Sequence, residues 1–269
     1  MQYDPIKRVI GNVVSTNVFL RKTFYRLLDL LLLRAWHVKK ALREFKSNAV
    51  KPLSILDAGM GFGQYTWFLA KLFPETNILA IDVKEEQVAD CNNFFSKLNL
   101  SNRVTCKVDD LVVYRKENAF DLILCVDVME HILEDEQVFS NYAVSLKKGG
   151  MLLISTPSDQ GGSDVHGSDE SSFIEEHVRD GYNAGDIREK LLRAGFSKAI
   201  VQYTYGKPGS IAWRLSMKIP IVLLGKSKAF FILLPFYYLL VYPFCYALNY
   251  ADTRGIHPTG TGLIVKAWK

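Results

Sequence analysis

One segment constrains this chain more than any other: the apolar run ILDAGMGFG at residues 55–63, which ends in an acidic residue and three alternate glycines. An apolar run without polar alternation is typical of a parallel strand that is buried on both faces. Gly59, Gly61 and Gly63 would then allow a tight turn and a close ligand approach, because a Cβ atom there would collide. The pattern predicts a buried strand, a glycine-rich turn and a ligand site at the strand end.

The same alternation of strand and helix continues downstream. Repeated βα units with short connections predict a doubly wound α/β fold, a mostly parallel sheet of seven strands counting a last one at residues 261–269. The other expected strands are residues 54–58, 77–83, 103–110, 120–128, 151–157 and 198–205, and the expected helices between them are residues 65–73, 85–98, 140–148 and 184–196.

Two basic segments flank an acidic middle. Residues 1–51 hold 11 Lys and Arg against 3 Asp and Glu, and residues 205–269 hold 8 against 1, although the net charge is only +5. Both segments are also rich in leucine and aromatic residues, which favours an anionic membrane surface over nucleic acid as partner. Residues 17–46 lack Gly and Pro and repeat apolar residues at helical spacing, so we expect one long or two shorter helices there.

Residues 206–260 separate two expected strands by far more than an ordinary loop, which indicates an insertion. Within it, residues 229–248 form 20 residues without a charge, long enough to span about 30 Å of bilayer, although Pro235 and Pro243 interrupt them. A single crossing is excluded if the flanking strands pair in one sheet. The alternatives are a membrane-dipping hairpin, an interfacial helical cap, an apolar lid over the site, and a helical subdomain or dimer interface. Basic residues that precede the run favour membrane contact: Lys207, Arg214, Lys218, Lys226 and Lys228.

The four cysteines lie far apart and form no CxxC pair, so neither a zinc cage nor a disulfide framework is indicated. The start of the chain lacks the apolar region of a secretory signal. We therefore expect a cytoplasmic protein, peripheral on the inner face of the membrane.

Acidic residues end three consecutive expected strands. Asp57 ends the first, Asp82 the second and Asp109 the third, and the carboxyl ends of parallel strands form the crevice where such folds bind ligands. Asp82 is placed to accept both hydroxyls of a ribose, and Asp109 with the Asp110 backbone is placed to meet an adenine. GxGxG after an acidic residue differs from the GxGxxG of dinucleotide binders and from the GK[ST] ending of phosphate loops.

These motifs resemble the class I S-adenosylmethionine-dependent methyltransferases, particularly the branch containing ubiquinone and menaquinone biosynthesis methyltransferases. The resemblance covers about residues 50–205 and the final strand, through LDAGMGFG, AIDV, VDDL, FDLILCVDVMEHI, LKKGGMLLISTP and EEHVRDGYNAGDIREKLLRAGF. It implies S-adenosylmethionine as cofactor, S-adenosylhomocysteine as product and an antiparallel pair of last strands. The residues expected to contact the cofactor are Asp57, Gly59, Gly61, Gly63, Asp82, Val83, Asp109, Asp110, Val126 and Asp127.

The resemblance also divides the chain. Residues 1–50 look like the basic helical lid of such enzymes, residues 51–205 and 261–269 like the cofactor-binding core, and the hydrophobic insertion 206–260 departs from the family's minimal pattern.

Methyl transfer depends on alignment more than on a strong catalytic signature. If the acceptor is a hydroxyl group, His131 and His177 are the candidate bases. Asp127, Glu130 and His131 stand at i, i+3 and i+4, and a similar Glu-x-x-Glu-His cluster in some methyltransferases for ubiquinone precursors and RNA ends holds a divalent ion. A metal site here is a second hypothesis.

The sequence therefore predicts methyl transfer to a lipophilic small molecule, such as a quinone precursor, polyprenyl compound, lipid or aryl lipid, at oxygen or carbon. One alternative is a soluble small-molecule methyltransferase whose insertion is an active-site lid. Another class of protein, an RNA-binding protein or RNA methyltransferase, would use the basic ends on phosphates. We expect no nucleic-acid partner, and an oligomer is compatible with the sequence.

Overall fold

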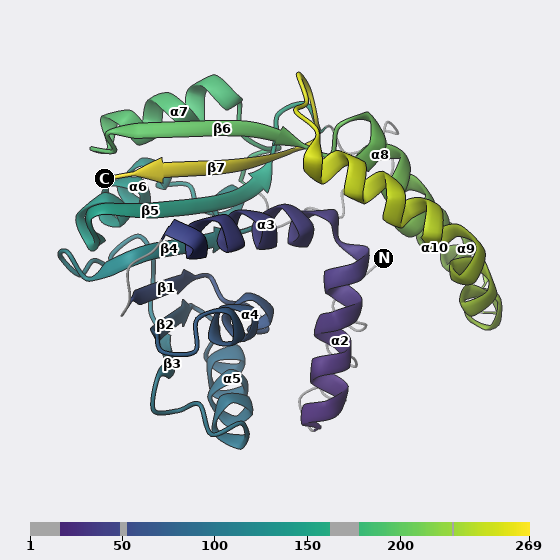
Figure 1. The fold of residues 1–269 in the computed structure, drawn as a ribbon, viewed down its shortest axis with the longest axis horizontal. Helices are drawn as coiled ribbons and strands as arrows, with labels where there is room; N and C mark the ends of the chain where they lie inside the picture. Colours follow the sequence, from purple (N-terminus) through teal and green to yellow (C-terminus); the bar gives the residue numbers. More distant parts are fainter. Residues whose placement is uncertain (1–16, 49–52, 162–177, 228) are drawn as a thin grey trace.

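The computed structural model describes residues 17–48, 53–161, 178–227 and 229–269, and its sheet has the strand order β3-β2-β1-β4-β5-β7-β6 (Figure 1). Neighbouring strands are parallel except at β7, which runs antiparallel to both β5 and β6. The predicted sheet, including its antiparallel last pair, is confirmed. The strands are β1 (Ser54–Ala58), β2 (Asn77–Asp82), β3 (Val104–Val108), β4 (Phe120–Val126), β5 (Leu146–Pro157), β6 (Lys198–Thr204) and β7 (Gly262–Trp268).

One boundary was wrong. Residues 146–148 were expected to end a helix, but they begin β5, because the backbone of Leu146 pairs with Phe120 of β4. Leu146 is buried in the core, and an apolar residue is compatible with a buried helix as well as with a buried strand.

Helices cover both faces of the sheet. Successive residues of β4 point to opposite sides: Leu122 and Leu124 into one core, Ile123 and Cys125 into the other. The first core is covered by α4 (Gln64–Leu72), α5 (Glu85–Lys97) and α3 (Leu33–Asn48), and the second by α6 (Asp135–Ser145) and α7 (Ala184–Arg193).

The N-terminal segment forms two helices, α2 (Val18–Leu31) and α3, because Leu32 has an extended backbone that separates them. The Asn17 side chain caps α2 by accepting from the backbone N–H of Phe19 at 2.8 Å. Figure 1 shows α3 lying along the sheet and α2 turning sharply away from it.

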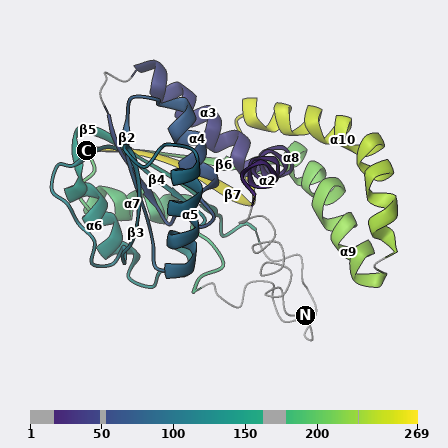
Figure 2. The same ribbon diagram turned by 90° about the horizontal axis from the view of Figure 1, so that it is seen from below.

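The insertion is helical, as predicted, and projects from the sheet edge where β6 ends and β7 begins (Figures 1 and 2). We call residues 207–254 the apolar arm. Thr204 and Gly262, on either side of it, are direct partners in the β6–β7 register, so the arm leaves and returns at one point. Its elements are α8 (Lys207–Trp213), a π-helical turn (Arg214–Lys218), α9 (Ile219–Lys226) and α10 (Phe230–Arg254).

Helix α10 contains Pro235 and Pro243 and is bent (Figure 2). Each proline removes one N–H donor from the helix and crowds the preceding turn, which accounts for the bend. Hydroxyl groups of Tyr237 and Tyr238 donate to the carbonyls of Leu215 and Ser216, each at 2.7 Å, and so fasten α10 to the π-helical turn.

Candidate active site

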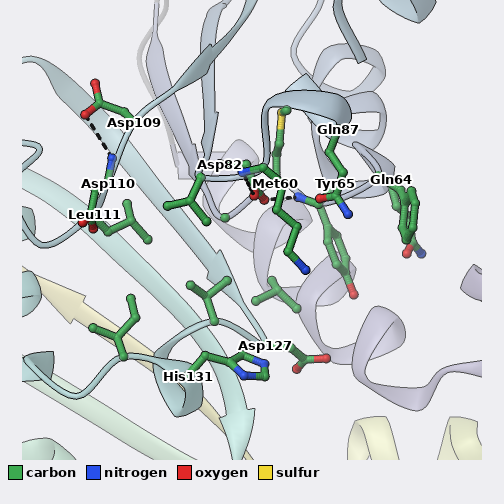
Figure 3. Close-up of a pocket in the computed structure, with 18 of the residues that line it drawn as sticks. Met60, Gln64, Tyr65, Asp82, Gln87, Asp109, Asp110, Leu111, Asp127 and His131 are labelled. Atoms are coloured by element: carbon green, nitrogen blue, oxygen red, sulfur yellow. Dashed lines mark hydrogen bonds between the residues drawn. The ribbon is translucent and has the colours of Figure 1, made fainter. Parts of the chain in front are cut away.

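A cavity of about 920 Å³ opens at the carboxyl edge of the sheet, between the glycine-rich turn and α2 (Figure 3). It brings together residues from the ends of β1, β2, β3 and β4, as the sequence predicts. Of the ten residues expected to contact the cofactor, eight line this cavity: Gly59, Gly61, Asp82, Val83, Asp109, Asp110, Val126 and Asp127.

The glycine-rich turn has three glycines with positive φ, and they have different neighbours. A Cβ atom at Gly59 would overlap the Val128 side chain, and one at Gly63 would lie 2.9 Å from the sulfur of Cys91. At Gly61 a Cβ atom would meet no atom within 4 Å, although φ is +51°. Gly59 and Gly63 are thus required by packing, whereas Gly61 keeps the floor of the cavity open.

Asp57 and Gly63 do not line the cavity. The Asp57 side chain is only 2% exposed and lies beneath the turn, where it accepts a hydrogen bond from Thr66 Oγ1 at 2.5 Å. Burial raises the pKa of Asp57 to about 7, although the Thr66 hydrogen bond acts in the opposite direction. Asp57 is therefore placed to act on a ligand through the turn or through water rather than by direct contact.

Asp82 and Asp109 hold the backbone at the ends of β2 and β3. Asp82 accepts from the backbone N–H groups of Gly61 at 2.9 Å and Lys84 at 3.0 Å. Asp109 accepts from the N–H of Asp110 at 3.1 Å. A carboxylate oxygen has two lone pairs, so both side chains can accept further hydrogen bonds from a ligand in the cavity.

Helix α2 is fastened directly to the glycine-rich turn. The buried guanidinium of Arg21 donates to the Phe62 carbonyl at 2.9 Å, to the Tyr25 hydroxyl at 2.6 Å and to Asp90 Oδ2 at 2.6 Å. The Tyr25 hydroxyl also donates to the Phe62 carbonyl. Helix α2 therefore lines the cavity and is hydrogen-bonded to the glycine-rich turn that also lines it. The sequence did not predict this role of Arg21.

Arg34, at the start of α3, reaches into the cavity and forms an ion pair with Asp127. Its backbone N–H donates to the Tyr205 hydroxyl at 3.1 Å. Nearby, the buried hydroxyl of Tyr65 has no hydrogen-bond partner among the residues that the structure describes, and its side chain also lines the cavity. Buried polar atoms in proteins are nearly always satisfied, so the Tyr65 hydroxyl fits a polar group of a bound ligand. Sequence patterns gave no signal for either residue.

His131 lines the cavity from a short 3₁₀ turn, Met129–His131 (Figure 3). Its neighbour Glu130 is buried and accepts from Thr156 Oγ1 at 3.1 Å, and burial together with the charge of Asp127 raises the pKa of Glu130 to about 8. Among the described residues, no three His, Cys, Asp or Glu side chains gather in a group that would hold a metal ion. Asp127 is instead paired with Arg34.

His177, the other candidate base, lies outside the described residues, and its role stays a prediction. The next residue, Val178, lines the cavity and donates its backbone N–H to the Glu130 carbonyl at 3.0 Å.

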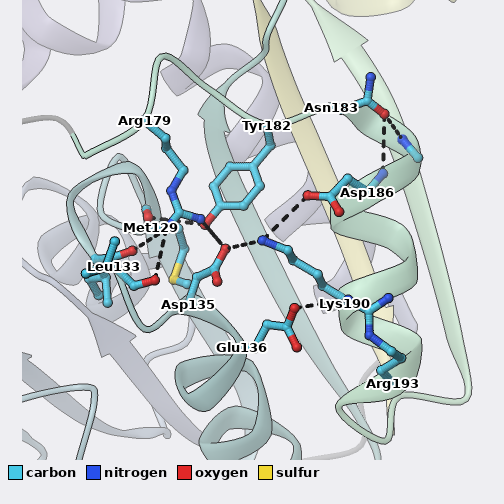
Figure 4. Close-up of polar contacts among 12 residues, drawn as sticks. Met129, Leu133, Asp135, Glu136, Arg179, Tyr182, Asn183, Asp186, Lys190 and Arg193 are labelled. Carbon is cyan, nitrogen blue, oxygen red and sulfur yellow. Dashed lines mark hydrogen bonds and ion pairs between the residues drawn. The ribbon is translucent and has the colours of Figure 1, made fainter.

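An ion-pair network around the buried Asp135 holds the loop that contributes Ile132 and Leu133 to the cavity (Figure 4). Asp135 accepts from Lys190 Nζ and the Tyr182 hydroxyl, both at 2.9 Å, and from Arg179. Burial alone would raise the pKa of Asp135, but these three donors lower it. Arg179 also donates to the Ile132 carbonyl at 2.6 Å, so the segment after residue 177 is tied to the loop that precedes α6.

The cavity has two kinds of wall. Carboxylates and backbone groups from the strand ends form the polar part of the lining. The apolar part includes side chains from α2 and from the segments that follow β3 and β4, among them Phe24, Leu28, Leu32, Leu111, Val112, Val128, Ile132, Leu133 and also Val178.

Known proteins resemble this chain in its central part. The family described as "Methyltransferase domain" matches residues 56–152. Malonyl-[acyl-carrier protein] O-methyltransferase of Bacillus cereus is 29% identical over 133 residues, which are 49% of this chain and 48% of that protein. Ubiquinone biosynthesis O-methyltransferase of Coxiella burnetii is 27% identical over 107 residues, 40% of this chain and 44% of that protein. The chain thus spans about half the length of these relatives.

A solved structure extends the likeness beyond the central part. Phosphoethanolamine N-methyltransferase 2 of Haemonchus contortus, solved in complex with S-adenosyl-L-methionine, has a TM-score of 0.60 over 87% of this chain and 52% of that one, at 23% identity. The shared fold, the glycine-rich turn and the strand-end carboxylates around one cavity agree with the sequence matches. The chain therefore contains a class I S-adenosylmethionine-dependent methyltransferase domain.

Proposed function

We propose that this protein transfers a methyl group from S-adenosylmethionine to a lipophilic small molecule at a membrane surface. One observation carries the proposal: a cavity with a polar floor and an apolar wall opens at the same sheet edge from which an exposed apolar arm projects.

When bound, S-adenosylmethionine supplies an electrophilic methyl group, and the residues of the chain bind and orient it. In our proposal Asp82 accepts from the ribose, and Asp109 with the Asp110 backbone meets the adenine. Gly61 lets the backbone approach the ligand, and the backbone at Val126 and Asp127 borders the methionyl part. Asp57 favours a cationic ligand from beneath the turn.

The acceptor would lie against the apolar part of the lining, to which Phe24 and Leu28 of α2 contribute together with Ile132 and Leu133. An acceptor hydroxyl must lose its proton, and His131 is the described side chain in the cavity that suits this role. Both sequence relatives are named O-methyltransferases, which supports an oxygen acceptor. A carbon acceptor is the alternative.

The arm carries an apolar surface that the other described residues leave exposed. Helix α10 is long and apolar enough to cross a membrane, yet only 6% of its most apolar stretch is buried. Transferring a largely exposed Leu or Phe side chain out of water contributes about 1 to 2 kcal/mol. Seven of its large side chains are more than half exposed: Phe231, Ile232, Leu233, Phe236, Leu239, Leu240 and Phe244.

The topology restricts how the arm meets a bilayer. Because its two ends, Thr204 and Gly262, pair in one sheet, the chain must leave and return on the same side of the membrane. The proposed arrangement is therefore an interfacial or shallowly inserted helical hairpin. No described residue of the arm lines the cofactor cavity, so the structure gives no support to the arm as an active-site lid.

A labelling experiment tests the proposed function. The purified protein is incubated with methyl-labelled S-adenosylmethionine and extracts of its own organism, and the label is followed into lipid, water-soluble, protein and RNA fractions. We expect label in the lipid fraction. Label confined to any of the other three fractions would refute a lipophilic acceptor while leaving methyl transfer intact.

A further inference from the structure

A second cavity, of about 400 Å³, lies at the base of the apolar arm, between the end of β6, the start of α8 and the segment that precedes β7. None of the residues that line it also lines the cofactor cavity. Its polar lining includes Gln160, Lys207, Ser210, Arg214, Thr259 and Thr261.

This cavity is positively charged. Lys207, Ser210 and Arg214 are spaced at i, i+3 and i+7, so they share one face of the helical segment that begins the arm. Neither Lys207 nor Arg214 forms an ion pair with any described residue, and none of the described residues that line the cavity is Asp or Glu. Two positive charges therefore line it, and no carboxylate among the described residues pairs with either of them.

The buried carboxylate that packs against the start of the arm, Asp252, already has hydrogen-bond partners within the chain. It is fully buried and accepts from the N–H of Gly209 at 3.0 Å, from the N–H of Tyr205 at 3.2 Å and from His37 Nε2 at 2.8 Å. These bonds hold the first turn of the arm against α3. Asp252 therefore stabilises the fold of the arm and leaves the charges of Lys207 and Arg214 for a ligand.

The donors suit a phosphate group. A guanidinium donates to two phosphate oxygens in a planar, bidentate geometry, and an ammonium adds a second charge. The hydroxyls of Ser210, Thr259 and Thr261 provide further hydrogen bonds of the kind that phosphates accept.

The surroundings indicate where such a phosphate comes from. Ile211 and Trp213 are exposed beside the cavity, and the exposed apolar residues of α9 and α10 continue outward from it. Tryptophan and cationic residues are enriched at the headgroup level of a bilayer, above an apolar segment that enters the acyl region. Along the arm, Lys207, Trp213 and Arg214 likewise come first, and the exposed apolar residues of α9 and α10 follow them.

We propose that this cavity binds the phosphate of a lipid headgroup and so anchors the base of the arm at the membrane surface. The inference rests on the membrane contact in the proposed function. Tyr205 lines this cavity and also accepts the hydrogen bond from Arg34, which lines the cofactor cavity, so the two sites share a wall.

The test compares two vesicles that carry the same surface charge in a phosphate-free bilayer of digalactosyl diacylglycerol. One contains phosphatidic acid and the other sulfoquinovosyl diacylglycerol, in amounts adjusted to equal zeta potential. The full chain should bind the phosphatidic acid vesicles about tenfold more tightly or better. Lys207→Gln/Arg214→Gln should lose this preference. Lys148→Gln/Arg188→Gln, which removes two exposed charges on β5 and α7 rather than on the arm, should keep it.

The phosphate site would be overturned if the full chain bound both kinds of vesicle equally. It would also be overturned if the two double variants showed the same preference for phosphatidic acid vesicles. Calorimetry with inorganic phosphate and glycerol 3-phosphate identifies the source. If either soluble phosphate binds as tightly as the vesicles, the cavity serves a soluble ligand and the lipid assignment is wrong.

The outcome can be separated from that of the proposed function. S-adenosylhomocysteine binding and label transfer are measured on the same preparations, and both double variants should keep normal cofactor affinity. Lipid methylation without phosphate-selective binding would refute the anchor alone. Phosphate-selective binding without methyl transfer would refute the proposed enzyme activity alone.

Discussion

The glycine-rich turn and the apolar arm differ in where their residues find partners. At the turn, Gly59 packs on Val128 and the Asp57 side chain is hydrogen-bonded to Thr66. Tyr25 of α2 donates a hydrogen bond to the Phe62 carbonyl, so these turn residues find their partners inside the chain. On the arm, seven large apolar side chains of α10 are more than half exposed. We therefore expect a substitution at the turn to change the stability of the fold or the affinity for the cofactor. A substitution on the arm should instead change binding to a partner outside the chain, such as a membrane.

The largest effect is expected at Gly59. In Gly59→Ala the new Cβ atom overlaps the Val128 side chain at a backbone with φ of +80°, so we expect a loss of about 3 kcal/mol or more in the free energy of unfolding. Thermal unfolding measures it. Gly149→Ala is the matched control, because Gly149 has φ of +77° with nothing within 4 Å of a Cβ atom, and it should cost only about 1 to 2 kcal/mol. Equal losses would show that backbone strain, not packing, governs the turn.

The second effect tests the arm. Replacing Leu239, Leu240 and Phe244 with serine should weaken vesicle binding by about 3 to 5 kcal/mol, because three exposed apolar side chains no longer enter the lipid. Unfolding temperature and cofactor affinity should stay as in the wild type. Vesicle sedimentation and calorimetry measure the two quantities. A variant that changes from dimer to monomer, with unchanged vesicle binding, would assign this surface to a second copy of the chain.

A third, smaller effect separates ligand contact from packing within the turn itself. Gly61→Ala adds a Cβ atom to the open floor of the cavity, so S-adenosylhomocysteine should bind about 100-fold more weakly. The stability loss should match that of Gly149→Ala, since both positions have positive φ and open space. Unchanged affinity, measured by calorimetry, would move the ligand away from Gly61.

The smallest effect concerns pH. The pKa of Asp57 is about 7 in the folded chain, and a cationic ligand favours its charged form. Between pH 7.5 and pH 6 the affinity for S-adenosylhomocysteine should fall about tenfold, and binding at pH 7 should release a fraction of a proton. In Asp57→Asn the affinity should be lower at pH 7.5 and nearly independent of pH over this range.

The same pKa has the opposite consequence for stability without ligand. It is raised above the ordinary value of 3.8, so the folded chain holds this proton more tightly and loses stability as the pH rises from about 4 to 7. Relative to the wild type, Asp57→Asn should gain stability across that interval. A constant difference between the two proteins would mean that Asp57 is charged throughout.

Local patterns in the sequence predict most of the central α/β fold. The strands, the glycine-rich turn and the strand-end carboxylates depend on residues close together in the chain, and parallel strands necessarily bring their carboxyl ends to one edge. The contacts of Arg21 with Phe62 and of Arg34 with Asp127 join segments 41 and 93 positions apart. No periodicity records such pairs, so these two arginines could not be found from the sequence.

Asp57 shows a subtler limit. Its place before the glycines predicts that it helps to hold the ligand, directly or through water, and this stays a prediction. Its carboxylate lies beneath the turn, bonded to Thr66, a position that no sequence pattern indicates. The helix boundary at residues 146–148 was wrong because pairing with Phe120 decides it, and that partner is distant in sequence.

The meeting of Thr204 with Gly262 has an evolutionary consequence. A hairpin of any length can be grafted or trimmed between two paired positions while the register of the sheet is preserved. Selection can therefore lengthen, shorten or replace the arm without disturbing the cavity at the strand ends. Close cousins of this protein should accordingly keep the glycine-rich turn and differ most between these two residues.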